Sequence, residues 1–90
     1  MSRTRVYKQA TLDIQQRFFT FIQDLANEKR LPGGVAGYCE TYGIDRRHFY
    51  AQKNNLHKGN FEIAWTLPLI KHFQVSAKWL LFGEGTKYEE

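Results

Sequence analysis

The apolar residues between positions 14 and 25 recur at the spacing of a single α-helical face. Their steps along the chain are four, three, one and three residues, through Ile14, Phe18, Phe21, Ile22 and Leu25. An α-helix places residues three and four apart on the same side, so this spacing buries one stripe of side chains and leaves the remainder in water. The pattern predicts a long first helix at about 12–28, with Thr11 as its N-terminal capping residue.

Helix breakers divide the middle of the chain into shorter helices. The Pro-Gly-Gly run at 32–34 ends the first helical region and precedes a second helix, expected at 35–42. Gly43 accepts a positive φ and allows a tight turn. Asp45 can then cap a third helix, which we expect to start at Arg46 and to end at Asn54 or Asn55.

The last third of the chain predicts two more helices. A fourth helical region at 61–73 contains Pro68, which removes a backbone donor. This helix either starts before Pro68 and is kinked there, which we favour, or starts near Thr66 as its cap. A short fifth helix is expected at 77–82. Because no segment alternates like a strand, the sequence predicts a compact, all-α domain of five helices.

Chain length and cysteine content indicate the number of domains and the redox compartment of the protein. Ninety residues suffice for one domain, which we place at 11–86, between a basic arm or tail at 1–10 and a C-terminal tail at 87–90. The single Cys39 excludes an internal disulfide and favours a reducing compartment. No apolar run approaches the length needed to cross a bilayer, and no secretory signal is recognisable at the N-terminus. We therefore expect a cytoplasmic protein.

Positive charge is concentrated in two blocks, although the net charge of the chain is only +4. Residues 1–8 contain three basic residues and no acidic one. Residues 45–58 contain four basic residues against Asp45. Such clustering favours a face that binds a polyanion, although a solvated face with a loose tail has the same composition.

The second and third helices, joined at Gly43, form the pattern of a helix-turn-helix unit. Cys39 provides the small residue where the two helices cross, and Ile44 and Phe49 point inward. Arginine can bind a guanine edge with two hydrogen bonds, and asparagine can do the same with an adenine edge. The candidate DNA-binding residues are Arg46, Arg47, His48, Tyr50, Ala51, Lys53 and Asn54, together with Arg3 and Arg5 from the N-terminal block.

Three sequence motifs carry a resemblance to a known family. The stretch at 75–85 reads Val-Ser-Ala-Lys-Trp-Leu-Leu-Phe-Gly-Glu-Gly, and the shorter motifs are Arg17-Phe18 and Tyr42-Gly43-Ile44. With them, residues 11–86 resemble the lambda-repressor-like, Cro-type helix-turn-helix domains. The resemblance implies a five-helix DNA-binding domain, a third helix in the major groove of double-stranded DNA, and a dimeric, repressor-like transcription regulator.

The sequence departs from that family at four places. Gln52 stands where an aliphatic residue is usual, and Cys39 replaces alanine. Gly33 and Gly34 stand where a capping serine often begins the second helix, and Tyr50 is bulkier than the small polar residue often found there.

The C-terminal region contains the candidate dimer contact. We expect Phe73, Trp79 and Leu80 in the core, and either Trp65 or Phe82 exposed to pack against a second subunit. Leu81 and Phe82, close to the chain end, are the expected contact of a homodimer.

No residue pattern indicates an enzyme, a cofactor site or a small-molecule ligand. The spacings of His48, His57 and His72 match no metal-ligand pair on one helix, and a glycine motif at 33–37 lacks the strand of a dinucleotide site. Two other classes of function are compatible with the sequence. One is a protein-interaction module of the same fold, such as a toxin partner or phage component. The other is an RNA-binding adaptor, for which only Tyr50 offers an exposed aromatic ring.

Overall fold

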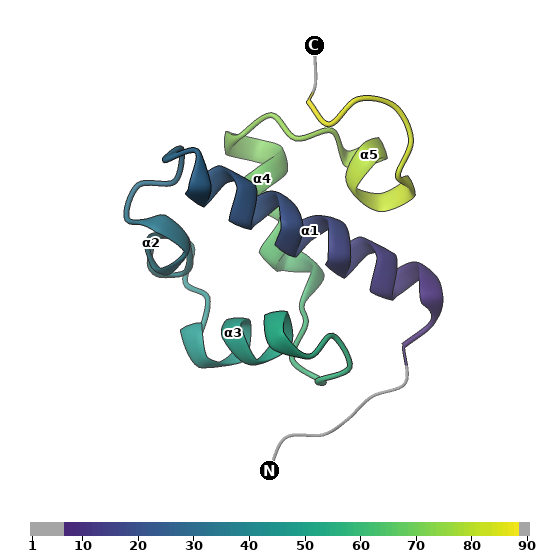
Figure 1. The fold of residues 1–90 in the computed structure, drawn as a ribbon, viewed down its shortest axis with the longest axis horizontal. Helices are drawn as coiled ribbons and strands as arrows, with labels where there is room; N and C mark the ends of the chain where they lie inside the picture. The colour runs from purple at the N-terminus through teal and green to yellow at the C-terminus, as the bar shows by residue number, and fades with distance from the viewer. Residues whose placement is uncertain (1–6, 89–90) are drawn as a thin grey trace.

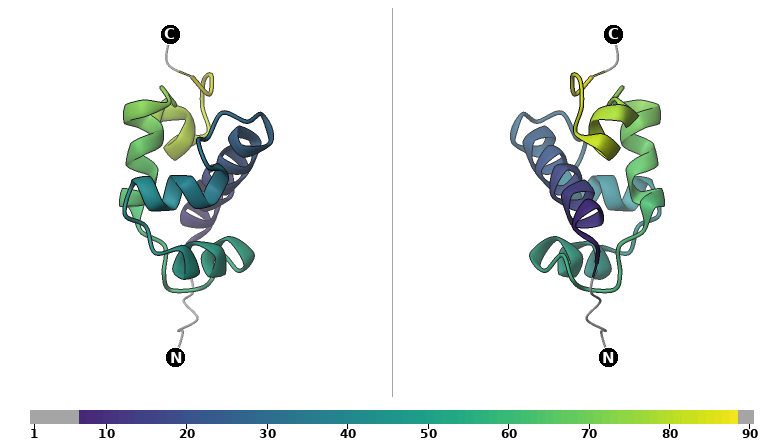
Figure 2. Two further views of the ribbon diagram at one scale, coloured as in Figure 1. Left: turned by 90° about the vertical axis from the view of Figure 1, so that its left-hand side faces the viewer. Right: turned by 90° about the vertical axis from the view of Figure 1, so that its right-hand side faces the viewer.

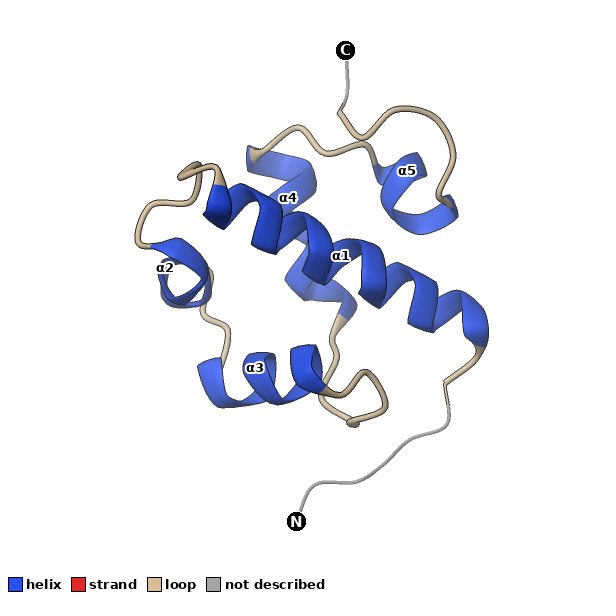
Figure 3. Ribbon diagram, viewed as in Figure 1, coloured by secondary structure: helices blue, strands red, loops and turns tan. Residues whose placement is uncertain are grey.

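A computed structural model describes residues 7–88 and contains, within that range, five α-helices and one short 3₁₀ helix. In chain order they are α1 (Gln9–Asn27), α2 (Gly34–Thr41), α3 (Arg46–Asn54), the 3₁₀ helix η1 (Ile63–Thr66), α4 (Leu67–His72) and α5 (Ala77–Phe82). Residues 7–88 form no strand, only one isolated antiparallel bridge between Val75 and Tyr88 (Figure 3). The all-α prediction is therefore confirmed.

The helices surround one core, with α1 on one side and α4 on the other (Figures 1 and 2). Helix α1 packs against both α2 and α5, and α2 packs against α3. Helix α3 lies at one end of the molecule and α5 at the opposite end, as all three views show. The fold therefore exposes one long side of α3 at an edge, away from the C-terminal helix.

Aromatic rings fill the part of the core beneath α3. Phe18 and Phe19 of α1 contact Phe49 of α3 edge to face, with ring centroids 5.9 and 5.2 Å apart. Trp65 of η1 approaches Phe49 from another side, at 5.4 Å. Edge-to-face pairs of this kind add to the stabilisation from burial. The buried hydroxyl of Tyr38 also donates to the Trp65 carbonyl at 2.7 Å and thereby ties α2 to η1.

Helix α1 begins three residues before the predicted start, and Thr11 is not its cap. Lys8 stands at the N-cap position, without a side-chain capping bond, and the Thr11 amide donates to its carbonyl at 3.0 Å. Neither proline nor glycine precedes Gln9, and a hydrogen bond from Gln9 to Asp13 supports the additional turn. The prediction failed because Thr11 can cap a helix only where the chain does not already continue one upstream.

The fourth helical region is divided in two rather than kinked. Pro68 lies in the first turn of α4, where its missing N–H has no intrahelical partner to lose. The preferred continuous helix at 61–73 is therefore wrong, and the alternative start near Thr66 matches the structure. Thr66 does not cap with its side chain, however, because its hydroxyl donates to the Ile63 carbonyl.

Helix α5 has its predicted bounds, and Ser76 caps it by accepting a bond from the Trp79 amide. Leu80 is fully buried, whereas Phe73 and Trp79 are half-buried against the core. The sequence predicted that either Trp65 or Phe82 is exposed. In the structure Trp65 is buried and Phe82 is 69% exposed.

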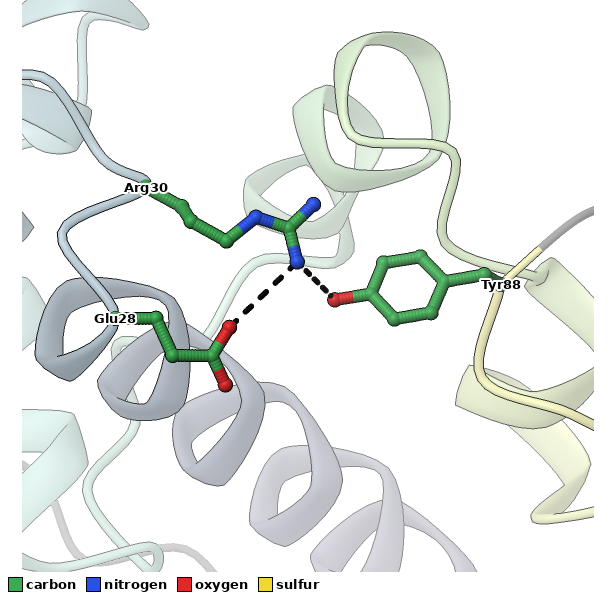
Figure 4. A network of polar contacts seen from close by, with 3 residues as sticks. All are labelled: Glu28, Arg30 and Tyr88. Atoms are coloured by element: carbon green, nitrogen blue, oxygen red, sulfur yellow. Dashed lines mark hydrogen bonds and ion pairs between the residues drawn. The ribbon is translucent and has the colours of Figure 1, made fainter.

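The packed chain extends to Tyr88, beyond the expected boundary at 86. The Tyr88 ring packs edge to face on Phe21, with centroids 5.5 Å apart, and its hydroxyl accepts a bond from Arg30 Nη1 at 2.7 Å. Arg30 also pairs with Glu28 at 3.6 Å (Figure 4). Tyr88 thus packs against α1 and is hydrogen-bonded to the segment that follows this helix.

Candidate nucleic-acid interface

A tight turn joins α2 to α3. Gly43 has a φ of +69°, and the Ile44 amide donates to the Cys39 carbonyl at 2.8 Å. Cys39 is fully buried, and burial raises the pKa of its thiol while the nearby Arg46 acts in the opposite direction. A buried, protonated thiol is a small packing group, in agreement with the structural role predicted for Cys39.

Asp45 caps α3 as predicted. Its Oδ1 accepts hydrogen bonds from the amides of Arg47 at 2.9 Å and His48 at 3.2 Å. These bonds, the one from His48 first, lower the pKa of the Asp45 carboxyl. The cap satisfies two N–H groups at the helix start, so α3 keeps its geometry up to its first residue.

The inner side of α3 consists of Phe49 and Gln52, both fully buried. A helix turns by about 100° per residue, and the side opposite this pair therefore carries four of the candidate residues. They are Arg47, Tyr50, Ala51 and Asn54. Arg46 and His48 lie on the two flanks of this outer side.

The structure leaves most of the candidate residues of α3 accessible. Arg46, Arg47, His48 and Asn54 are exposed, and the side chains of Arg46, Arg47 and Asn54 make no hydrogen bond or salt bridge within residues 7–88. Tyr50 is 37% exposed, and Ala51 is half-buried.

Lys53 is placed differently from the other candidates. It is half-buried, and its Nζ donates to Gln23 Oε1 of α1 at 2.8 Å. This bond draws the ammonium group toward α1, at the edge of the surface formed by the other candidates. Tertiary contact with α1 produced this placement, and no signal in the sequence near Lys53 indicated it.

Glu40 of α2 lines the same shallow hollow as Arg46 and Arg47 at the start of α3. It introduces a negative charge beside the basic residues that the sequence pattern did not indicate. Asp45 lines the hollow as well, so two carboxylates there offset the charges of the two arginines.

The N-terminal candidates Arg3 and Arg5 lie outside the described residues. Tyr7, the first described residue, donates its hydroxyl to the Lys58 carbonyl at 2.8 Å, and its ring lies 6.4 Å from that of His57. The chain therefore joins the domain beside the loop that follows α3.

No group of three or more His, Cys, Asp or Glu side chains within residues 7–88 is arranged to hold a metal ion. Within the same residues, none of the helices has the length and apolar character required to cross a membrane. No protein-family model, curated protein or solved structure matches this chain.

Proposed function

We propose that this chain is a sequence-specific, double-stranded DNA-binding protein of the lambda-repressor-like kind, a small repressor-like regulator of transcription. In this proposal α2 and α3 are a helix-turn-helix unit, and α3 enters the major groove. One observation carries the proposal above all. A short, capped helix at an edge of the molecule presents Arg47, Tyr50 and Asn54 on the side opposite the buried pair Phe49 and Gln52.

Each outer side chain has a chemistry suited to part of a duplex. Arg47 can pair with the O6 and N7 of guanine, and Asn54 with the N6 and N7 of adenine. Tyr50 offers an aromatic edge to a thymine methyl group. Arg46 and His48, on the flanks, are better placed for phosphates, which fix the register of a protein on DNA.

Two copies would pair through α5. Phe82 is 69% exposed, and Leu81 beside it is half-buried. Since α5 lies at the end of the molecule away from α3, pairing there leaves both copies of α3 uncovered and accessible to DNA. Phe82→Asp should then lower DNA affinity at unchanged helix content. A footprint that covers one isolated half-site at saturation would contradict the dimer.

The direct test starts with selection from a pool of random duplexes, followed by sequencing. Arg47→Ala and Asn54→Ala should each cost about 1–3 kcal/mol at one base position of the selected site and relax the preference there. Lys71→Ala in the last turn of α4 is the matched control, because it removes an exposed positive charge from a helix that belongs neither to the helix-turn-helix unit nor to the proposed dimer contact. If no sequence is enriched, or if both variants bind like the wild type, the proposal is wrong.

A second candidate function rests on a different observation. Ile63 and Leu67 are apolar, 57% and 45% exposed, and one helical turn apart on η1 and α4. Exposed apolar residues at this spacing favour contact with another protein. The interaction module becomes the better account if α3 substitutions leave DNA binding unchanged while Ile63→Asp abolishes binding to a protein partner.

A further inference from the structure

Gln52 is a fully buried amide on the inner side of α3, and it is bonded on both of its polar atoms. Its Nε2 donates to Gln15 Oε1 of α1 at 2.6 Å and to the Leu56 carbonyl at 2.8 Å. Its Oε1 accepts from the Asn60 amide at 3.1 Å. One side chain therefore joins α3 to α1 and to two points of the loop that follows α3.

The contacts of Gln52 constrain α3 in a way that its other buried residue does not. Phe49 sets how deeply α3 sits in the core, but the burial of its ring is non-directional, and its edge-to-face contacts change only gradually with small rotations about the helix axis. Hydrogen bonds weaken steeply when their angles change. Three of them, one to α1 and two to the loop after α3, define the rotation and the axial position of α3 together.

Base recognition depends on that rotation more than phosphate contact does. Paired hydrogen bonds from Arg47 or Asn54 to a base edge require placement within about 0.5 Å and 10–20°. Contacts to phosphates tolerate more freedom and do not discriminate between sequences. We infer that Gln52 is the positioning residue of α3, and that its hydrogen bonds set the sequence selectivity of the proposed DNA-binding surface. This inference rests on the proposed function.

The network also predicts which of its two glutamines is the costlier to replace. Gln15 Nε2 is buried without a hydrogen-bond partner, so Gln15 takes part only through its oxygen. Gln15→Met removes one bond and also removes this unpaired donor. Gln52→Met leaves the Gln15 oxygen, the Leu56 carbonyl and the Asn60 amide all without their partner, which is the costlier change.

The test compares the affinity for the selected duplex with that for an unrelated duplex, at one salt concentration and at a temperature where every variant is folded. We expect Gln52→Met to lower this ratio about tenfold, with affinity for the unrelated duplex nearly unchanged, and Gln15→Met to lower it about two- to threefold. Val75→Ala is the stability control, since Val75 is fully buried two residues before α5, the helix at the end of the molecule opposite α3. It should lower the melting temperature without changing the ratio.

Backbone amide hydrogen exchange gives a second readout that needs no DNA. Gln52→Met should accelerate exchange selectively in α3, whereas Val75→Ala should not. An unchanged ratio for Gln52→Met, or an equal fall for Val75→Ala, overturns the inference. If Gln52→Met does not fold, Gln15→Met decides, and unchanged selectivity and α3 exchange in that variant overturn it.

The wild-type protein is measured first. A wild type that does not distinguish the two duplexes refutes the proposed function itself, and the selectivity role of Gln52 fails with it. A wild type that does distinguish them, together with a Gln52→Met variant of equal selectivity, refutes the inference alone.

Discussion

Replacing Gly37 by alanine should destabilise the domain, although the same change stabilises most helices. Gly37 lies within α2, where alanine ordinarily gains about 0.5–1 kcal/mol because it restricts the unfolded chain. A methyl group built on Gly37, however, overlaps the carbonyl oxygen of Pro32 and lies 3.0 Å from its carbonyl carbon. These are backbone atoms, and they cannot rotate away as the end of a side chain would.

The size of the effect follows from the two opposing terms. Overpacking costs about 1–3 kcal/mol where side chains can adjust, and the upper end applies when a backbone segment must shift. After subtraction of the helical gain, we expect Gly37→Ala to lose about 2 kcal/mol. For a domain of this size that loss lowers the melting temperature by roughly 8–16 °C.

Gly43→Ala separates the steric effect from backbone strain. Gly43 has a φ of +69° with nothing within 4 Å of an added methyl group, so only the left-handed conformation is penalised. That penalty is about 1 kcal/mol, and Gly43→Asn should reduce it because asparagine tolerates this conformation. Urea unfolding followed by tryptophan fluorescence measures all three variants. A Gly37→Ala protein as stable as the wild type would refute the reasoning.

Three further predictions concern the ends of helices and of the chain. The Arg17 guanidinium donates to the carbonyls of Leu80 and Leu81 at 2.8 and 3.0 Å, so Arg17→Met should cost about 1–3 kcal/mol in urea unfolding; equal stability would contradict this capping role. Because the pKa of Asp45 is lowered in the folded state, its contribution is present above about pH 4 and is lost as the pH falls through the folded pKa. In Asp45→Asn the free energy of unfolding, measured in urea at several pH values, should therefore fall less steeply with decreasing pH below about pH 4 than in the wild type. The same pH dependence in both proteins would contradict this. Deletion of residues 1–6 should lower the slope of log affinity against log salt by about 0.9 for each phosphate that this segment binds, and an unchanged slope would make it a passive tail.

The amino-acid sequence by itself determined the elements whose signals are local. The apolar period, the cap at Asp45 and the glycine at 43 lie within or next to the helices that they define, so the bounds of α3 could be predicted. The outer side chains of α3 were predictable for the same reason, since a buried Phe49 on a regular helix determines which residues face away from it.

Only the tertiary structure decided the features that depend on partners distant in sequence. Gln15 and Gln52 are 37 residues apart, and Lys53 and Gln23 are 30 apart. Before the chain folds, nothing near Gln52 indicates that a polar residue in an apolar position will find an acceptor on α1. Packing across the core brings these groups together, and a buried amide becomes tolerable only once its hydrogen bonds are formed.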